Sequence, residues 1–263
     1  MRTTATTLAW PSCADMDFKD KAKEVAEWEP LLEGTYHYLD GAHTFSEENF
    51  TVDFLPAGQL HRYRSEILSR VDTGEFFKMN VRLEVNKFFH PLSASVERAL
   101  GDRFTRETYT VDTHEQTLKC VFEDENGLHT DVRPFGNKHQ LVLPCFLTSG
   151  LFTLSKKIDA TGRTPVIYVT SPNDWTYQRP PEDKLLYVGI MAHNSDDLTS
   201  GGVVLPSAKY EIFEDDALDG GTPPVAQLWV SKLYAVPYQF EENTGTKIVV
   251  KRLKKLKHVQ EKF

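Results

Sequence analysis

The sequence predicts a mainly β protein: a long, curved antiparallel sheet, a barrel or half-barrel, with one or two helices capping or filling its concave side. Apolar and polar residues alternate through most of the stretch from Tyr36 to Val132, which is the period of half-buried strands. Short turn sequences separate these runs, without long helical segments between them. One run, Glu75–Lys87, would span roughly 40 Å as a strand, which suits a sheet that wraps around something.

The N-terminal region is predicted to precede the sheet. Residues 1–14 are interpreted as a flexible arm, and Asp17–Leu32 as a short helix packed on the sheet, because its apolar residues have partial helical spacing before Pro30 interrupts it. We expect a single β-rich domain over residues 1–263, in which 254–263 form a basic tail.

The clearest element of the predicted sheet is a hairpin of two long strands. The first strand carries His61, Tyr63 and Ile67 on one face, and Asp72-Thr73-Gly74 turns the chain into the second. The matching face of the second strand carries Phe77, Met79, Val81, Leu83 and Val85. Together these two faces predict one wall of a pocket.

Further strands are expected on both sides of an apolar middle segment. Before it, Asn126-Gly127 has the signature of a type I′ turn into a strand at Leu128–Val132. The middle segment, Leu141–Lys157, has spacings that favour a helix and is interpreted as a plug or lid across one end of the sheet. After it, the expected strands are Pro165–Thr170, Leu185–Met191, Ala208–Phe213, Val225–Tyr234 and Lys247–Leu253, with surface loops such as Asn194–Gly202 and Glu214–Pro224.

Composition narrows the class of function. A net charge of -8 argues against a nucleic-acid partner for the body of the protein, although seven of the 30 Lys and Arg residues gather in Lys247–Phe263. Three cysteines without a CxxC pair predict neither a disulfide framework nor a thiolate metal site. The start lacks a signal-peptide core and no apolar run is long enough to cross a bilayer, so the expected location is cytoplasmic.

The densest polar and aromatic cluster is Ser171–Pro181. Asp174, Trp175, Tyr177 and Arg179 are candidates for ligand binding here, because the rings can stack on an aromatic ligand while the guanidinium pairs with a carboxylate. The alternative is structural: a turn whose aromatic residues cover one edge of the core and whose Arg179 pairs with Asp174.

His61 and Tyr63, with Phe77, Met79 and Val81 from the neighbouring strand, are the other ligand-binding candidates. A histidine on an apolar face is more often a hydrogen-bonded core residue than a catalyst, so no catalytic residue is assigned. The sequence lacks phosphate-loop, GxSxG, HExxH and paired Cys/His motifs, and therefore predicts no cofactor and no metal.

In strand pattern alone, the chain resembles lipocalin-like and lipid-carrier half-barrel proteins. Our first hypothesis is the binding of a hydrophobic or aromatic small molecule in the concavity of the sheet. The alternatives are a cofactor-independent enzyme of small-molecule or natural-product metabolism that uses the same pocket, and a non-enzymatic protein-interaction module. Homodimer formation is left open.

Overall fold

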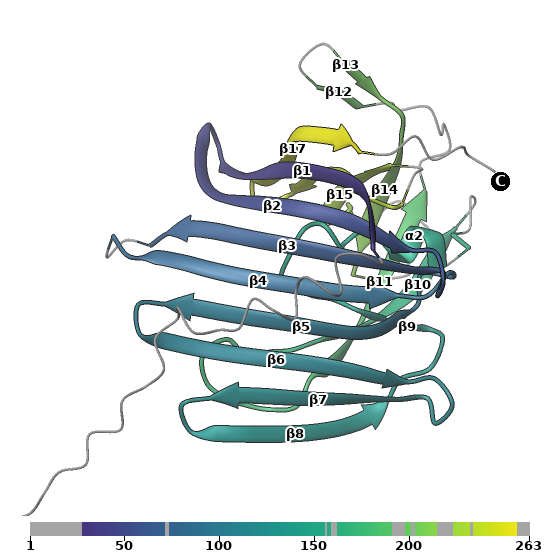
Figure 1. Cartoon of the computed structure of the whole chain (residues 1–263). Helices are drawn as coiled ribbons and strands as arrows, with labels where there is room; N and C mark the ends of the chain where they lie inside the picture. Colours follow the sequence, from purple (N-terminus) through teal and green to yellow (C-terminus); the bar gives the residue numbers. More distant parts are fainter. Residues whose placement is uncertain are drawn as a thin grey trace, which may run out of the picture.

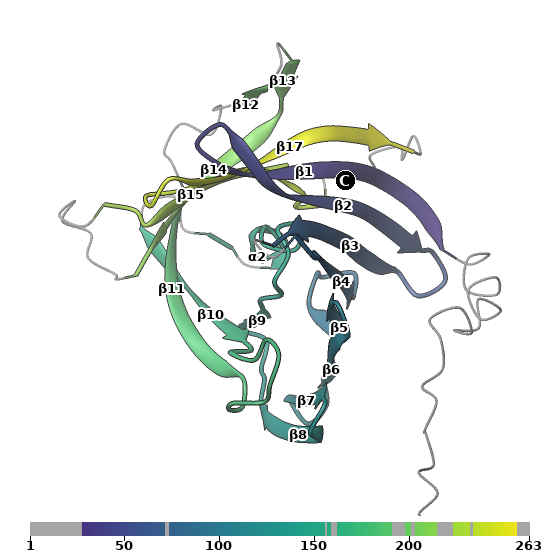
Figure 2. The same ribbon diagram turned by 90° about the vertical axis from the view of Figure 1, so that its left-hand side faces the viewer.

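One large sheet curves around a single short helix in the part of the chain that the structure describes (Figure 1; Figure 2). This computed structural model describes residues 28–71, 74–155, 157–158, 162–190, 198–200, 203–214, 223–231 and 234–256. The first eight strands are β1 (Glu29–Asp40), β2 (His43–Leu55), β3 (Leu60–Arg70), β4 (Phe76–Val85), β5 (Pro91–Leu100), β6 (Arg103–Asp112), β7 (Thr117–Asp124) and β8 (Gly127–Pro134).

The second half begins at β9 (His139–Leu141), which is followed by the helix α2 (Phe152–Ser155). The remaining strands are β10 (Arg163–Thr170), β11 (Glu182–Ile190), β12 (Leu198–Ser200), β13 (Val203–Leu205), β14 (Ser207–Phe213), β15 (Ala226–Ser231), β16 (Pro237–Glu242) and β17 (Thr246–Lys255). None of the described helices is long and apolar enough to span a membrane.

The sheet is mainly antiparallel and unclosed, which confirms the predicted fold class. Its 15 strands are ordered β8-β7-β6-β5-β4-β3-β2-β1-β17-β16-β15-β14-β11-β10-β9, and β12 pairs with β13 in a separate hairpin. Among the described strands, the β9–β10 pair alone is parallel. Figure 2 shows that the sheet curls around α2 and brings the β10–β11 end near β7 and β8. The two edge strands, β8 and β9, therefore follow one another in the chain but border an opening in the sheet.

The predicted long hairpin is confirmed by the β3–β4 pairing. Tyr63 pairs with Leu83 and Ile67 pairs with Met79, in the register that puts both apolar faces on the same side of the sheet. These four side chains are buried in one core, whereas Arg64 on the opposite face is exposed. Because a shift of one residue would reverse every side chain, this burial fixes the register.

The helix expected at Asp17–Leu32 is wrong in its described part. Glu29–Leu32 opens β1, where backbone pairing with both β2 and β17 replaces helical hydrogen bonds and buries Leu31 and Leu32. Pro30 is tolerated here because it lies at the start of the strand. The rest of the predicted helix and the arm at 1–14 lie outside the described residues, and the predicted tail at 254–263 begins inside β17.

The helix favoured at Leu141–Lys157 shrinks to the single turn of α2, with β9 and irregular backbone before it. Gly150 lies against the backbone of Ala235, where any side chain would collide with the Ala235 carbonyl oxygen. Close packing on the β15–β16 connection therefore overrides the helical spacing. The segment does lie inside the curve of the sheet, as a plug would (Figure 2).

Three smaller expectations also change. The Asn126-Gly127 hairpin exists, but its turn is not type I′, because only Gly127 has a positive φ (126°) and Asn126 does not. The expected loop Asn194–Gly202 contains β12, and the short strand β16 was not predicted. The five strands expected in the second half correspond to β10, β11, β14, β15 and β17.

Candidate functional site

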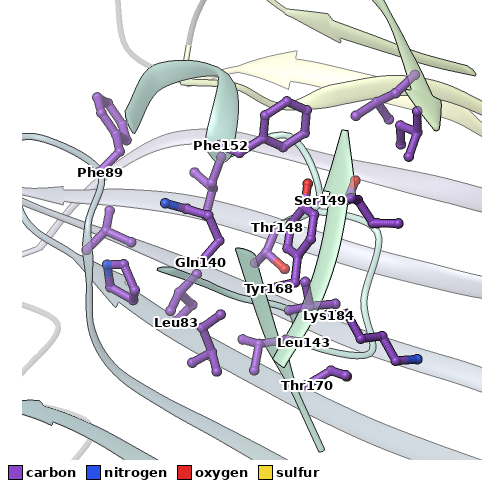
Figure 3. Close-up of a pocket in the computed structure, with 18 of the residues that line it drawn as sticks. Leu83, Phe89, Gln140, Leu143, Thr148, Ser149, Phe152, Tyr168, Thr170 and Lys184 are labelled. Carbon is purple, nitrogen blue, oxygen red and sulfur yellow. The ribbon is translucent and has the colours of Figure 1, made fainter. Parts of the chain in front are cut away.

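An apolar cavity of about 250 Å³ lies inside the curve of the sheet (Figure 3). Apolar side chains from seven strands, the β4–β5 turn and the segment around α2 form most of its wall: Leu83, Val85, Phe89, Pro91, Leu141, Val142, Leu143, Leu151, Phe152, Leu186, Ile212, Leu228 and Phe240. The polar lining residues are Gln140, Thr148, Ser149, Tyr168, Thr170 and Lys184. Such a wall suits a mainly apolar molecule with a few polar atoms.

The β4–β5 turn fixes one side of the cavity. Alternation along β4 turns Leu83 and Val85 inward, and the turn that follows adds Phe89. Phe89 has a left-handed backbone (φ 59°), a strained conformation for a bulky residue. Two backbone N–H groups of the turn donate to the side-chain oxygen of Asn86, at 2.9 and 3.1 Å, and hold this conformation. Hydrogen bonds to Asn86 therefore stabilise a strained backbone at Phe89, a residue that lines the cavity.

A buried carboxylate anchors another part of the wall. Glu48, on β2, is fully buried and accepts hydrogen bonds from the hydroxyl groups of Tyr38 and Ser65. It also accepts the backbone N–H groups of Phe146 and Leu147, at 2.9 and 3.1 Å. Burial raises the pKa of Glu48 above its usual value, and the four donors oppose this rise. Glu48 thus ties the segment before α2, which supplies the next part of the cavity wall, to the sheet.

Three polar side chains form a row across neighbouring strands of the wall. Tyr168 on β10 pairs with Gln140 on β9 and with Lys184 on β11, so the three side chains lie at one level on the same face. Figure 3 shows Gln140 and Tyr168 among the central lining residues and Lys184 at their periphery. Gln140 is only 5% exposed, and its Nε2 has no hydrogen-bond partner among the described residues. The row therefore offers donors to the cavity.

The ionisable groups of the cavity are few. Among the described lining residues, the ionisable side chains are those of Tyr168 and Lys184, and there is no carboxylate, imidazole or thiol. Burial raises the pKa of Tyr168 well above its usual value, so the phenol stays protonated at neutral pH and can donate. The wall can hold and orient a ligand, but its described lining residues include no carboxylate, imidazole or thiol that could act as a general base.

Of the residues predicted on β3 and β4, Leu83 and Val85 line this cavity, whereas Tyr63, Phe77, Met79 and Val81 lie on the inner face of the sheet outside it. Tyr63, Met79 and Val81 are buried in the core, and the Tyr63 hydroxyl donates to the backbone oxygen of Tyr234 at 2.9 Å. Phe77 packs against Trp175, with ring centroids 5.9 Å apart. Their role in ligand binding stays a prediction.

His61 lies one layer behind the cavity. Its ring is stacked on Phe89 at 4.9 Å and also contacts Phe54 and Tyr234. Burial lowers the pKa of His61 to about 4, so the ring is neutral near pH 7. Its Nδ1 has no hydrogen-bond partner in the described part of the chain. His61 therefore supports the wall at Phe89 without lining the cavity itself.

The second predicted cluster, Ser171–Pro181, connects β10 to β11 and crosses the inner face of β4–β8; we call it the strap. Tyr177 stacks on His129 at 4.3 Å, and its hydroxyl donates to Asp131 at 2.8 Å. Its backbone N–H donates to Asp124 at 2.9 Å. Trp175 lies below the guanidinium of Arg103, 4.6 Å from the ring centroid. The strap thus joins one end of the sheet to the other.

The remaining polar groups of the strap also have protein partners. Arg179 pairs with Glu182 at 3.0 Å, and not with Asp174 as in the structural alternative. Asp174 faces the buried Arg98 at 3.9 Å, and its carbonyl oxygen accepts the hydroxyl of Thr105. Asp174, Trp175, Tyr177 and Arg179 are thus brought together by the strap but are not among the cavity-lining residues. Ligand binding at the strap stays a prediction.

Sequence reasoning missed the row of Gln140, Tyr168 and Lys184. Each lies on a different strand, and the parallel β9–β10 pair that aligns two of them is not visible in a local pattern. Tyr168 and Thr170 do alternate within a predicted strand, which is the one available signal.

In the described residues, no group of three or more His, Cys, Asp or Glu could hold a metal ion.

Comparison with known proteins places the fold but not the function. No family model and no curated protein matches this chain. A solved beta-barrel-like protein of the domain of unknown function DUF1849 from Brucella abortus aligns with a TM-score of 0.50 and 9% identity, over 87% of this chain and 99% of that chain. A DUF1089 family protein from Pseudomonas aeruginosa aligns with a TM-score of 0.43 and 14% identity, over 74% and 89%. The similarity to the DUF1849 protein shows a β-barrel-like fold.

Proposed function

We propose that this protein binds a small, mainly apolar molecule in the cavity between α2 and β9–β11. The observation that carries the proposal is the cavity itself, walled by buried side chains such as Leu143, Phe152 and Leu228. Protein interiors are normally close-packed, so a partly open, mainly apolar cavity of about 250 Å³ that reaches buried core residues suits a ligand. Each methylene group that leaves water for this wall contributes about 0.8 kcal/mol.

Binding is favoured over catalysis by the chemistry of the wall. A cofactor-independent enzyme needs a group that takes or gives a proton near the working pH. Among the described lining residues the ionisable groups are the phenol of Tyr168, whose pKa is raised, and the ammonium of Lys184 at the periphery. The enzyme alternative would require a base from elsewhere.

Two adjacent residues on β11 give a matched test. Leu186 faces the cavity and is half-buried, whereas Leu185 faces outward and is 47% exposed. Leu186→Trp should fill the cavity, and Leu185→Trp should leave it open, because successive strand residues point to opposite faces. Binding is measured by titrating each protein with an apolar fluorophore that brightens when it leaves water.

The expected result is saturable binding by the wild type and by Leu185→Trp, and a loss of at least tenfold in affinity for Leu186→Trp. Circular dichroism melts confirm that both variants fold. Equal affinities in all three folded proteins, or no saturable binding at all, would contradict binding in this cavity.

A further inference from the structure

We infer that the ligand is a single-chain amphiphile with an anionic head group, bound with its head at Lys184 and its apolar chain inside the cavity. The inference rests on the proposed function and adds the class and the orientation of the ligand. It is carried by the polar row of Gln140, Tyr168 and Lys184, and by the charges around Lys184.

The row runs from the interior to the surface. Gln140 is buried, Tyr168 is 9% exposed, and Lys184 is exposed. Neighbouring strands lie about 4.8 Å apart, so the row covers roughly 10 Å of the wall. A ligand along it meets an ammonium group first, then a phenol, and finally a buried amide. This order matches a molecule that is charged at its outer end.

Among the described residues at the start of β11, the ammonium group of Lys184 is a cation that can pair with a ligand. Glu182 is paired with Arg179 at 3.0 Å, and Asp183 with Arg133 at 2.7 Å. Lys184 has no ion pair among the described residues, although two carboxylates precede it directly. The neighbouring acids are thus neutralised by arginines, and Lys184 presents at the edge of the cavity a positive charge that no described carboxylate pairs with.

The buried end of the row points to a second oxygen on the ligand. Nε2 of Gln140 is buried without a partner in the described structure, and such a donor costs free energy until an acceptor reaches it. The phenol of Tyr168 likewise makes no hydrogen bond with described residues and can donate. An oxygen of the head group, or a hydroxyl or carbonyl group next to it, would satisfy these donors. The apolar chain then lies against Leu143, Phe152 and Leu228.

Isothermal titration with probes that share one chain length separates the head group from the chain. The probes are decanoate, decyl phosphate and decanol, each kept below the concentration at which it forms micelles. Decanoate and decyl phosphate are the two sources of anionic head group, and decanol is the neutral reference. We expect at least one anion to bind about fivefold more tightly than decanol, the upper end of the range for one exposed ion pair.

Lys184→Gln removes the charge and keeps most of the side-chain length. It should weaken binding of the preferred anion about fivefold and leave decanol binding unchanged. Lys119→Gln on β7 is the matched control: Lys119 is another exposed lysine that does not line the cavity, and its replacement should change neither affinity.

The outcomes separate this inference from the proposed function. If decanol binds as tightly as both anions, or Lys184→Gln weakens decanol and the anion equally, the anionic head group is refuted while cavity binding stands. If Lys119→Gln weakens the anion as much as Lys184→Gln does, the attraction is non-specific and the inference fails. If none of the probes binds, the inference and the proposed function both fail.

Discussion

The strap and the polar row of the cavity wall are neighbours in the chain, but they differ in hydrogen bonding. The polar groups of the strap have partners within the protein, whereas the row includes a buried donor without a described partner. The strap leaves β10 shortly after Tyr168 and enters β11 just before Lys184. The side chains of the strap that looked most suited to a ligand, such as Tyr177 and Arg179, are bound to other parts of the protein. Nε2 of Gln140, by contrast, has no partner in the described part of the chain. Polar side chains that are already satisfied hold a fold together, whereas a buried donor that lines a cavity without a partner can accept a ligand atom as its partner.

The largest expected effect is at the inner face beneath the strap. Glu107 is 1% exposed and pairs with Arg98 at 2.5 Å, and the hydroxyl of Tyr109 donates to it. Glu107→Gln should lower the free energy of unfolding by about 3–5 kcal/mol, because the buried guanidinium of Arg98 loses its close counter-charge and keeps only the exposed carboxylate of Asp174 at 3.9 Å. Urea denaturation measures this loss. Glu97→Gln, which breaks the more exposed pair with Arg106, should cost less than about 1 kcal/mol.

The next effect lies within the strap. The side-chain oxygen of the buried Asn173 accepts the backbone N–H groups of Gln178 and Arg179, and its amide donates to the Arg179 carbonyl oxygen. Asn173→Ala should cost about 2–3 kcal/mol, since buried donors lose their acceptor. Thermal unfolding measures the loss, and affinity for the apolar fluorophore should stay within twofold. A strong loss of affinity in the folded variant would instead place the ligand at the strap.

On the cavity side, His61 predicts a dependence on pH. Its pKa is lowered to about 4 in the folded protein, against about 6.5 in the unfolded chain, so the unfolded chain binds more protons between these values. This group therefore makes the fold less stable as pH falls, by about 2 kcal/mol between pH 7 and pH 5. His61→Phe should lose that part of the dependence. If urea denaturation at the two pH values gives the same difference for both proteins, His61 is not held neutral by burial.

A smaller effect of opposite sign is expected at Gln140. Gln140→Leu removes a buried donor without a partner and adds apolar contact, so the ligand-free protein should gain about 1 kcal/mol in its free energy of unfolding. Thermal unfolding without and with the preferred anionic probe tests this, and the stabilisation by the probe should be smaller in the variant. A less stable ligand-free variant would show that Gln140 has a partner within the protein.

The sequence predicts much of the fold because strand alternation is local. The β3–β4 hairpin, with Tyr63 opposite Leu83, follows from period-two patterns and one short turn. The expected helix at Asp17–Leu32 fails in its described part because β17, more than 200 residues later, supplies a partner strand for β1. No local pattern contains that pairing.

The candidate site depends even more on contacts between distant residues. Leu83 and Val85 were placed correctly on the inner face, but which inner residues line a cavity and which fill a core depends on the segment around α2. The strap stood out in the sequence for its aromatic and charged residues, and the same residue types serve ligand contacts and internal hydrogen bonds. A buried donor without a partner, as in Gln140, can be recognised only in three dimensions.

The most direct test of this account is a crystal structure of the protein with decanoate or decyl phosphate, whichever binds more tightly. The account predicts an extended chain against Leu143, Phe152 and Leu228, with an oxygen of the head group within ion-pair distance of the Lys184 ammonium. A cavity that stays empty while the probe occupies the strap or the outer face of the sheet would contradict it.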